Sequence, residues 1–272
     1  MTDPPPDTDP VRETVTSADG TAIAYERTGS GPPLVLVHGG AAASHIDWEP
    51  VAPRLAEYFT VYAMDRRGRG ESGDADTYTV EREFEDVAAV VDSISEPVHL
   101  LGYSFGAICA LEAALRTDSI ATLVLYEPAL ADDGGEIFPE ELLQQIDDRL
   151  DGNDMVGALT VLLRSVGYSD EDIERLSTEE IWRVQLEATP TITRELRALN
   201  AYRFDPDRFG DLVVPTGLVT GSESPTLFRT STATLDEDLP NSRIITLPGQ
   251  THEAATAAPD LFVEKVASFL HK

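Results

Sequence analysis

The chain has 272 residues, 42% of them hydrophobic, which is enough to bury the core of one α/β domain with an insertion or of two small domains. Its 49 acidic residues outnumber 20 basic ones, and the net charge of −29 argues against nucleic acid or anionic membranes as partners. The sequence contains no apolar run of membrane-spanning length, and its single cysteine, Cys109, excludes an internal disulfide and a cysteine-based zinc cluster.

The acidic residues are spread through the whole chain rather than gathered in a tail. Only Lys265 and Lys272 are lysines, so arginines carry nearly all the positive charge. This composition resembles that of proteins from organisms with molar salt in the cytoplasm, where a Debye length of roughly 3 Å suppresses self-repulsion. We therefore predict a halophilic source. The first ten residues, MTDPPPDTDP, read as a disordered tail without a signal peptide, and we expect a cytoplasmic protein.

Strand and helix patterns follow one another along the first part of the chain. Residues 11–28 alternate around an Asp-Gly turn, which predicts an antiparallel hairpin. The run PLVLVHGG at 33–40 is typical of a strand buried on both faces of a parallel sheet. A helix is predicted from Trp48 to Tyr58, a strand over 59–65 and a helix over 81–93.

The alternation continues, is interrupted once and then resumes. The later elements are predicted as strands over 97–103, 121–128, 213–221 and 242–249, with helices over 105–116, from Thr226 and over 259–270. Residues 131–205 show only helical patterns and are interpreted as a helical lid inserted into a core formed by 11–130 and 206–272. The predicted fold class is α/β, with a mostly parallel sheet covered by helices on both faces.

A serine lies between two glycines in the stretch VHLLGYSFGAIC, residues 98–109. Ser104 either caps the helix that follows or is a nucleophile held at a tight strand-to-helix turn, where Gly102 and Gly106 leave room for the backbone. A serine hydroxyl is unreactive at neutral pH unless an adjacent base takes its proton. The choice between the two interpretations therefore depends on a histidine and a carboxylate.

Of the five histidines, one has the sequence context of a catalytic base. His252 follows the last predicted strand in a loop and precedes a helix. His99 is expected in the sheet and His271 at the C-terminal fringe, whereas His38 is expected to shape a loop. His45 follows the glycine-rich loop, where it either borders the pocket or has no catalytic part.

Over residues 20–270 the sequence resembles the α/β-hydrolase superfamily. The resemblance rests on five features that occur in this order: VHGG, DRRGRGESGD, GYSFG, a helical insertion and a histidine after the last strand. The resemblance implies that the backbone amides of Gly40 and Phe105 form the oxyanion hole. Dehalogenases and epoxide hydrolases of this fold carry aspartate at the elbow, so Ser104 argues against both activities. The resemblance also implies that the loop containing Asp65 and Arg66 has a structural role.

Two glutamates compete for the role of the acid that orients His252. The family usually places an aspartate after the penultimate strand, but here that stretch reads GSESP, with Ser224 at the acid position and Glu223 one residue earlier. Some relatives instead carry a glutamate after the strand that neighbours the nucleophile strand, where this chain has Glu127 in LVLYEP. Both assignments stay open, and Glu127 is preferred because a buried carboxylate needs a partner such as an imidazole.

We therefore predict a serine hydrolase that acts by nucleophilic acyl transfer on a small carboxylic ester, without a metal or an organic cofactor. Alternative activities are those of C–C hydrolases and cofactor-free perhydrolases or haloperoxidases. The alternative from another class is a non-catalytic ligand-binding protein. The expected partner is a small-molecule substrate, and the lid carries aromatic residues that either line an acyl pocket or form the lid's own core: Phe138, Tyr168, Trp182 and Tyr202.

Overall fold

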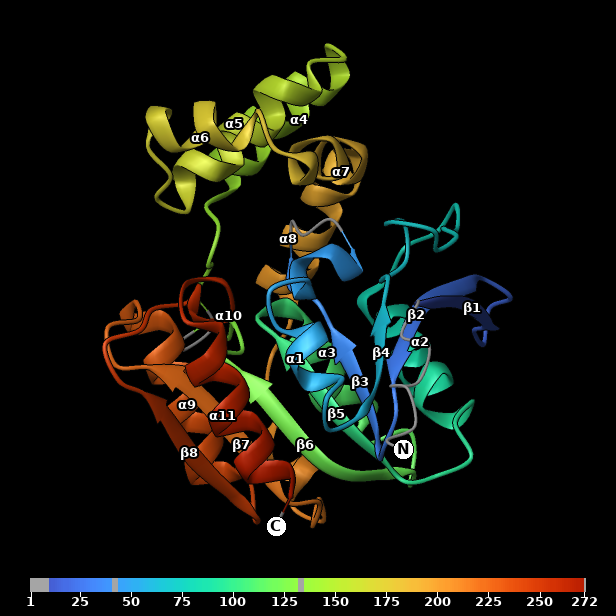
Figure 1. Cartoon of the computed structure of the whole chain (residues 1–272). Coiled ribbons are helices and arrows are strands. Elements are labelled where there is room, and N and C mark those ends of the chain that lie inside the picture. The colour runs from blue at the N-terminus through green and yellow to red at the C-terminus, as the bar shows by residue number, and fades with distance from the viewer. Residues whose placement is uncertain (1–9, 41–43, 132–134, 272) are drawn as a thin grey trace, which may run out of the picture.

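A computed structural model describes residues 10–40, 44–131 and 135–271, which form an eight-stranded sheet with helices on both faces (Figure 1). The predicted N-terminal tail, apart from Pro10, lies outside the described residues. The strands are β1 (Val11–Thr16), β2 (Ala22–Gly29), β3 (Pro33–Val37), β4 (Thr60–Met64), β5 (Val98–Tyr103), β6 (Ile120–Tyr126), β7 (Thr216–Gly221) and β8 (Ser242–Leu247).

The spatial order of the strands is β1-β2-β4-β3-β5-β6-β7-β8. The predicted hairpin of β1 and β2 is present and packs antiparallel against β4, and every other pairing is parallel. The predicted fold class is therefore confirmed. Parallel strands bring their carboxyl ends to one edge of the sheet, which is where open α/β sheets bind ligands.

Two apolar layers cover the sheet because neighbouring residues of a strand point to opposite faces. Leu100 of β5 packs with the helices of one face and with Leu199, and Leu101 packs with the helices of the other face. The first group comprises α2 (Val80–Asp92), α3 (Phe105–Ala113) and α9 (Thr226–Asp238). The second comprises α1 (Ala52–Leu55), α10 (Ala254–Ala257) and α11 (Pro259–Leu270).

The helix predicted from Trp48 to Tyr58 is wrong as a single element. The structure has a 3₁₀-helix, η1 (His45–Trp48), a turn, and then the four-residue α1. Proline has no backbone N–H to donate and clashes with the preceding turn, and this segment contains Pro50 and Pro53. Pro50 lies at the break between η1 and α1, whereas Pro53 lies in the first turn of α1, where its missing N–H is tolerated.

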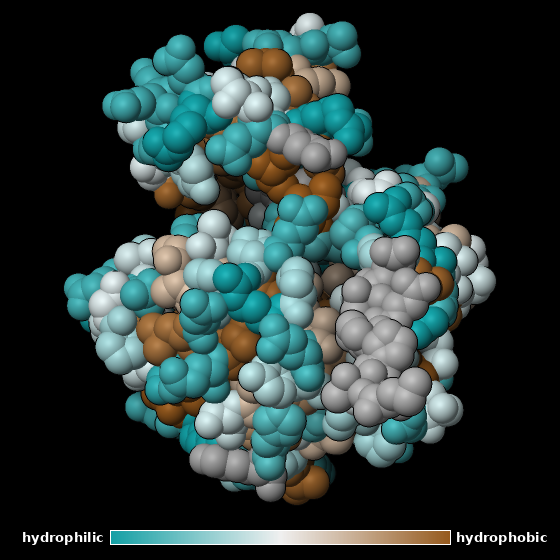
Figure 2. Space-filling view, in the orientation of Figure 1, coloured by the Kyte–Doolittle hydropathy of each residue, from teal (hydrophilic) through white to brown (hydrophobic). Residues whose placement is uncertain are grey.

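In the part of the chain that the structure describes, five α-helices lie between β6 and β7, and we call them the inserted helices. They are α4 (Glu140–Asp151), α5 (Met155–Ser165), α6 (Asp170–Leu176), α7 (Glu180–Ala188) and α8 (Ile192–Ala201), with the 3₁₀-helices η3 (Thr189–Thr191) and η4 (Pro206–Phe209). They lie beyond the carboxyl edge of the sheet (Figure 1). Figure 2 shows a recess between them and the rest of the molecule, with hydrophobic residues on its walls.

The inserted helices pack around a hydrophobic cluster of their own. Leu143, Leu159 and Leu196 are buried in it, and Tyr168 and Trp182 pack against it. Tyr202 packs instead against the core of the sheet. Among the helices that the structure describes, none is long and apolar enough to span a membrane.

Candidate active site

Four neighbouring strands end at the same edge of the sheet, and each is followed by a polar residue. Ser104 follows β5, Glu127 follows β6, Ser224 follows β7 by a short turn, and His252 follows β8 by a loop. The parallel register therefore gathers residues that are up to 148 positions apart in the sequence. The candidate site is this edge, on the side facing the inserted helices.

Ser104 occupies a strained position at the elbow between β5 and α3. Its φ is +54°, in the left-handed region that residues with a side chain rarely adopt. A Cβ on Gly102 would lie 2.3 Å from the Gly106 carbonyl oxygen, so the turn requires glycine there. The Ser104 side chain makes no capping hydrogen bond to α3. Ser104 occupies the N-cap position of α3, but its partly exposed side chain does not serve as the cap, so the hydroxyl is available for other contacts.

Glu127 is the second strained residue of the edge, with a φ of +47° directly after β6. Its side chain is fully buried. One carboxylate oxygen, Oε1, accepts hydrogen bonds from the Thr220 hydroxyl at 3.0 Å, the Gly221 amide at 2.7 Å and the Ser224 hydroxyl. These donors allow a charged carboxylate to be buried at the sheet edge.

The other oxygen of Glu127, Oε2, lies 2.6 Å from Nδ1 of His252. Burial opposes ionisation of Glu127, but the hydrogen bonds from His252, Ser224 and Gly221 outweigh it and lower the pKa of Glu127. An ionised carboxylate only accepts hydrogen bonds, so Nδ1 of His252 carries the proton and Nε2 is left as the basic nitrogen.

The His252 loop is fixed by aromatic residues from three elements. The hydroxyls of Tyr126 and Tyr103 donate to the His252 carbonyl oxygen at 2.5 and 3.1 Å. The ring of Phe228, from α9, stacks on the imidazole with a centroid distance of 3.7 Å and an interplanar angle of 7°. Tyr103 packs against the same imidazole at 4.7 Å. The orientation of the imidazole is thus set by its ring neighbours as well as by Glu127.

The remaining acid and histidine candidates lie elsewhere. Glu223 is exposed and accepts a hydrogen bond from the Ser222 hydroxyl, so the structure does not bring its side chain to His252. His45 contacts Asp65 at 2.9 Å and Glu26 at 3.6 Å instead of bordering Ser104. His99 and His271 pack on the ring of Phe59.

The two predicted oxyanion-hole residues flank the elbow. Phe105 supplies the first amide of α3, which has no acceptor within the helix. A Cβ placed on Gly40 would lie 3.5 Å from the Phe105 side chain, so the two residues are neighbours. No hydrogen bond joins the Ser104 hydroxyl to His252 in the described part of the chain; such bonds are often long in unliganded hydrolases and shorten when substrate binds.

Sequence reasoning missed the residues that support Glu127 and His252. The Thr220 hydroxyl and the Ser224 hydroxyl stabilise the glutamate, and Phe228 and Tyr126 hold the imidazole. The serine at the usual acid position was the available signal, because a hydroxyl there can donate to a carboxylate that comes from the neighbouring strand. Stacking by Phe228 has no sequence signature.

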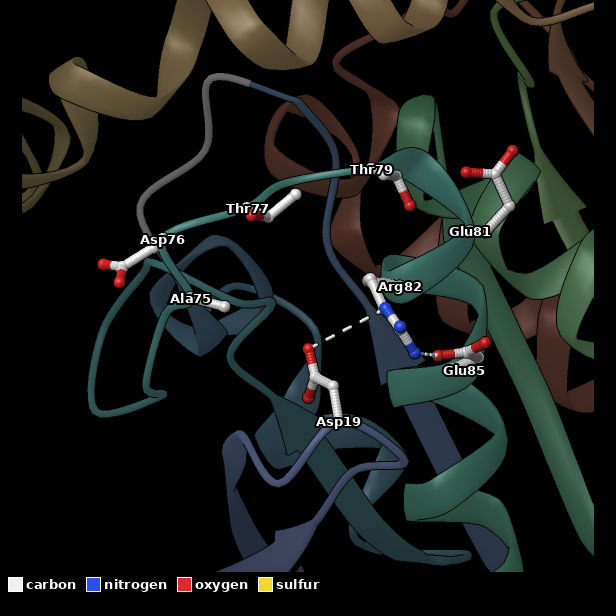
Figure 3. A pocket seen from close by; sticks show the side chains of 8 residues that line it. All are labelled: Asp19, Ala75, Asp76, Thr77, Thr79, Glu81, Arg82 and Glu85. Atoms are coloured by element: carbon white, nitrogen blue, oxygen red, sulfur yellow. Dashed lines mark hydrogen bonds and ion pairs between the residues drawn. The ribbon is translucent and has the colours of Figure 1, made fainter.

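Two further features bear on what the site can bind. Residues 10–40, 44–131 and 135–271 contain no group of three His, Cys, Asp or Glu side chains placed to hold a metal ion. A surface cavity of about 520 Å³ beside α2 is lined by charged and small residues, where Arg82 pairs with Glu85 at 2.6 Å and reaches Asp19 at 4.0 Å (Figure 3). None of the predicted site residues lines this cavity.

Comparison with known proteins places the chain in one enzyme family. The family model described as "Alpha/beta hydrolase family" matches residues 34–265, and the chain belongs to this family. The predicted class of enzyme, an α/β-fold hydrolase, is thereby confirmed.

Among its relatives, a structure of an alpha/beta hydrolase from Sphaerobacter thermophilus is 35% identical, with a TM-score of 0.82 over 95% of this chain and 100% of that one. The pimeloyl-[acyl-carrier protein] methyl ester esterase of Aeromonas hydrophila is 26% identical over 92% of this chain and 99% of that protein. RutD of Agrobacterium fabrum, whose name proposes it as a carbamate hydrolase, is 26% identical over 90% of this chain and 96% of that protein.

Proposed function

We propose that this hydrolase is a serine esterase in which Ser104 is the nucleophile, His252 the general base and Glu127 the acid that orients the imidazole. The observation that carries the proposal is the 2.6 Å contact between His252 Nδ1 and Glu127 Oε2, made beside a serine on a strained elbow. Strained backbone is retained where the surroundings hold it in place, and it clusters at active sites.

The proposed reaction follows from the protonation states of the site. As the Ser104 oxygen attacks the carbonyl carbon of the ester, its proton passes to Nε2 of His252. The imidazolium that forms is stabilised by ionised Glu127, and the carbonyl oxygen becomes an oxyanion held by the amides of Gly40 and Phe105. The imidazolium then gives the proton to the leaving alkoxide. Water, activated by the same histidine, hydrolyses the acyl-enzyme and releases the acid.

A small carboxylic ester with an apolar acyl group is the proposed substrate class. The recess between the inserted helices and the sheet presents hydrophobic walls, which favour apolar substrate groups (Figure 2). The methyl ester esterase among the relatives supports ester hydrolysis. The inserted helices, within residues 131–205, are proposed to act as the lid that sets the preference among esters.

The alternative activities use the same serine but differ in the bond that they cleave. A C–C hydrolase, a perhydrolase or a haloperoxidase would share the proposed triad, and the relative named for carbamate hydrolysis adds carbamates as a competing substrate class. A non-catalytic binding protein would not need a hydrogen bond between a buried, ionised Glu127 and His252. That pair favours catalysis over binding alone.

Labelling with a fluorophosphonate, combined with a panel of p-nitrophenyl esters of increasing acyl length, tests the proposal. We expect Ser104 to be labelled, as identified by peptide mass, and the shorter esters to be hydrolysed. A wild-type protein that neither labels nor hydrolyses any ester would point to a binding protein. Labelling without ester hydrolysis would favour a carbamate or C–C substrate.

The halophilic source and the cytoplasmic location stay predictions. They rest on the composition, with 49 acidic residues against 20 basic ones.

A further inference from the structure

A buried cluster of four charged side chains lies directly behind the proposed oxyanion hole. Arg66 and Arg69, from the loop after β4, face Glu83 of α2 and Glu195 of α8. All four side chains are at most 2% exposed. Two positive and two negative charges balance, as burial requires, but ion pairs of this kind are weak evidence for a gain in stability. Their position suggests another use.

Arg66 contacts both chain segments that carry the proposed oxyanion amides. Its Nη1 donates to the Gly39 carbonyl oxygen at 2.8 Å, one residue before Gly40. Its guanidinium lies over the Phe105 ring, 4.4 Å from the centroid. Its backbone amide donates to Nε2 of His38 at 3.0 Å. One side chain thus connects the β3 loop to the start of α3.

Glu195 brings an inserted helix into the same cluster. Its Oε2 accepts from Arg66 at 2.6 Å and also from Arg69. Its Oε1 would lie 2.7 Å from a Cβ on Gly40, so the carboxylate is in contact with the oxyanion-hole glycine itself. The carboxylate of Glu195 therefore connects α8 to the Gly40 backbone, so that a shift of α8 would change the surroundings of Gly40.

We propose that Glu195 is a positioning residue, which together with Arg66 holds the Gly40 and Phe105 amides in the geometry that binds the oxyanion, so that seating of α8 completes the hole. The proposal rests on the proposed serine mechanism. It predicts that disturbing Glu195 lowers the rate of the chemical step more than it weakens substrate binding, because the amides are needed most in the transition state.

The test compares Glu195→Gln with a control that breaks another contact of the same helix. Glutamine keeps the size of the side chain in contact with Gly40 but removes the negative charge that pairs with the two arginines. Either its neutral oxygen takes the place of Oε2 and its NH₂ group faces Gly40, or its NH₂ group faces the guanidinium donors. The control is Asp74→Asn, which removes the carboxylate that pairs with Arg194 at 2.9 Å on the exposed side of α8. Both variants break a contact between α8 and the core, but only the first reaches the oxyanion hole.

We expect Glu195→Gln to lower kcat by about tenfold to a hundredfold, less than the loss of an oxyanion donor, with KM within about threefold. The inhibition constant of a trifluoromethyl ketone, whose serine adduct carries an oxyanion, should rise by the same factor as kcat/KM falls. A residue that only stabilises the fold would not move this inhibition constant in a folded variant. For Asp74→Asn, kcat, KM and the inhibition constant of the trifluoromethyl ketone should each stay within about twofold of wild type.

The proposal is overturned if Glu195→Gln matches Asp74→Asn, or if kcat falls while the affinity for the trifluoromethyl ketone is unchanged. If Glu195→Gln does not fold, Glu195→Asp keeps the charge balance but shortens the reach, and a wild-type kcat in that variant overturns the proposal equally. A wild-type enzyme without a reactive serine would instead overturn the proposed function, so the two failures are distinguishable.

Discussion

The carboxyl edge of the sheet and the inserted helices are held in place by different interactions. At the edge, Ser104 and Glu127 have strained backbone, and Glu127 is held by four hydrogen bonds that its carboxylate accepts. The inserted helices pack around their own apolar cluster and meet the core through ion pairs, such as Arg194 with Asp74, and through Leu199 of α8, which is buried in the core of the sheet. The comparison suggests that the edge determines the chemistry and the helices determine which substrate reaches it, with Glu195 as the link between them.

The largest effect is expected from the edge itself. Ser104→Ala and His252→Ala should each lower kcat for ester hydrolysis by about 10⁶, because both variants remove the same proton-transfer unit. The measurement is ester turnover, with circular dichroism to verify the fold. The double variant should be no slower than either single variant, and a further thousandfold loss would show that the two residues act separately.

The next largest effect distinguishes the two candidate acids. Glu127→Gln should lower kcat by at least about a hundredfold, because the amide cannot stabilise the imidazolium as a carboxylate does. Glu223→Gln, the matched control, should stay within a few-fold of wild type, since its side chain is exposed and away from His252. Side-by-side kinetics in which the order is reversed would assign the acid to Glu223.

A smaller effect is expected from the inserted helices. Tyr168 packs against the apolar cluster of the inserted helices, and burial, followed by the charges of Glu253 and Asp47, raises the pKa of Tyr168 to about 12. Tyr168→Ala should change kcat/KM for long-chain relative to short-chain esters by about tenfold, as expected for one apolar contact, without slowing fluorophosphonate labelling. Val166→Ala, at a neighbouring exposed position, serves as the control. Slower labelling in Tyr168→Ala would place this residue in the chemistry rather than in specificity.

The stability of the core should depend on pH through buried histidines. Burial, together with the charges of Arg66 and Arg69, holds the pKa of His38 well below 6.5, and burial also lowers the pKa of His99. Below about pH 6.5 the unfolded chain therefore binds more protons than the folded one, so the free energy of unfolding falls as the pH falls.

Denaturant titrations from about pH 7 to about pH 5, above the ordinary range of glutamate, test this dependence. His38→Gln keeps an acceptor for the Arg66 amide without titrating, so its free energy of unfolding should change less over this range than that of wild type. An equal pH dependence in both proteins would exclude His38 as its source. The pKa of His45 is raised, so this residue has the opposite effect on the free energy of unfolding. The stability that His45 contributes is fully present below pH 6.5 and is lost as the pH rises through its raised pKa.

The smallest expected effect concerns salt and the whole surface rather than either region. With a net charge of −29, the melting temperature should rise by several degrees from about 0.1 M to about 1 M KCl, because screening reduces repulsion between carboxylates. Differential scanning calorimetry measures this change. A flat or falling melting temperature would remove the prediction of a halophilic source and leave the catalytic proposal unchanged.

The sequence alone determined the order of the elements, the fold class, the elbow around Ser104 and the loop that carries His252. These features are local: hydrophobic periodicity, glycine spacing and the position of a residue after a strand can each be read within a few residues. In the segment from Trp48 to Tyr58, a helical pattern competed with the prolines Pro50 and Pro53, and the prediction of a single helix was wrong.

Only the tertiary structure decided between Glu127 and Glu223 as the partner of His252. The sequence offers a glutamate after each of two neighbouring strands, and which side chain turns toward the imidazole depends on the left-handed backbone of Glu127 and on donors from the next strand. Likewise, Arg66 and Glu195 are 129 positions apart, and their pairing exists because α8 returns to the sheet edge. Contacts of this kind are made by packing between distant segments, and no local pattern encodes them.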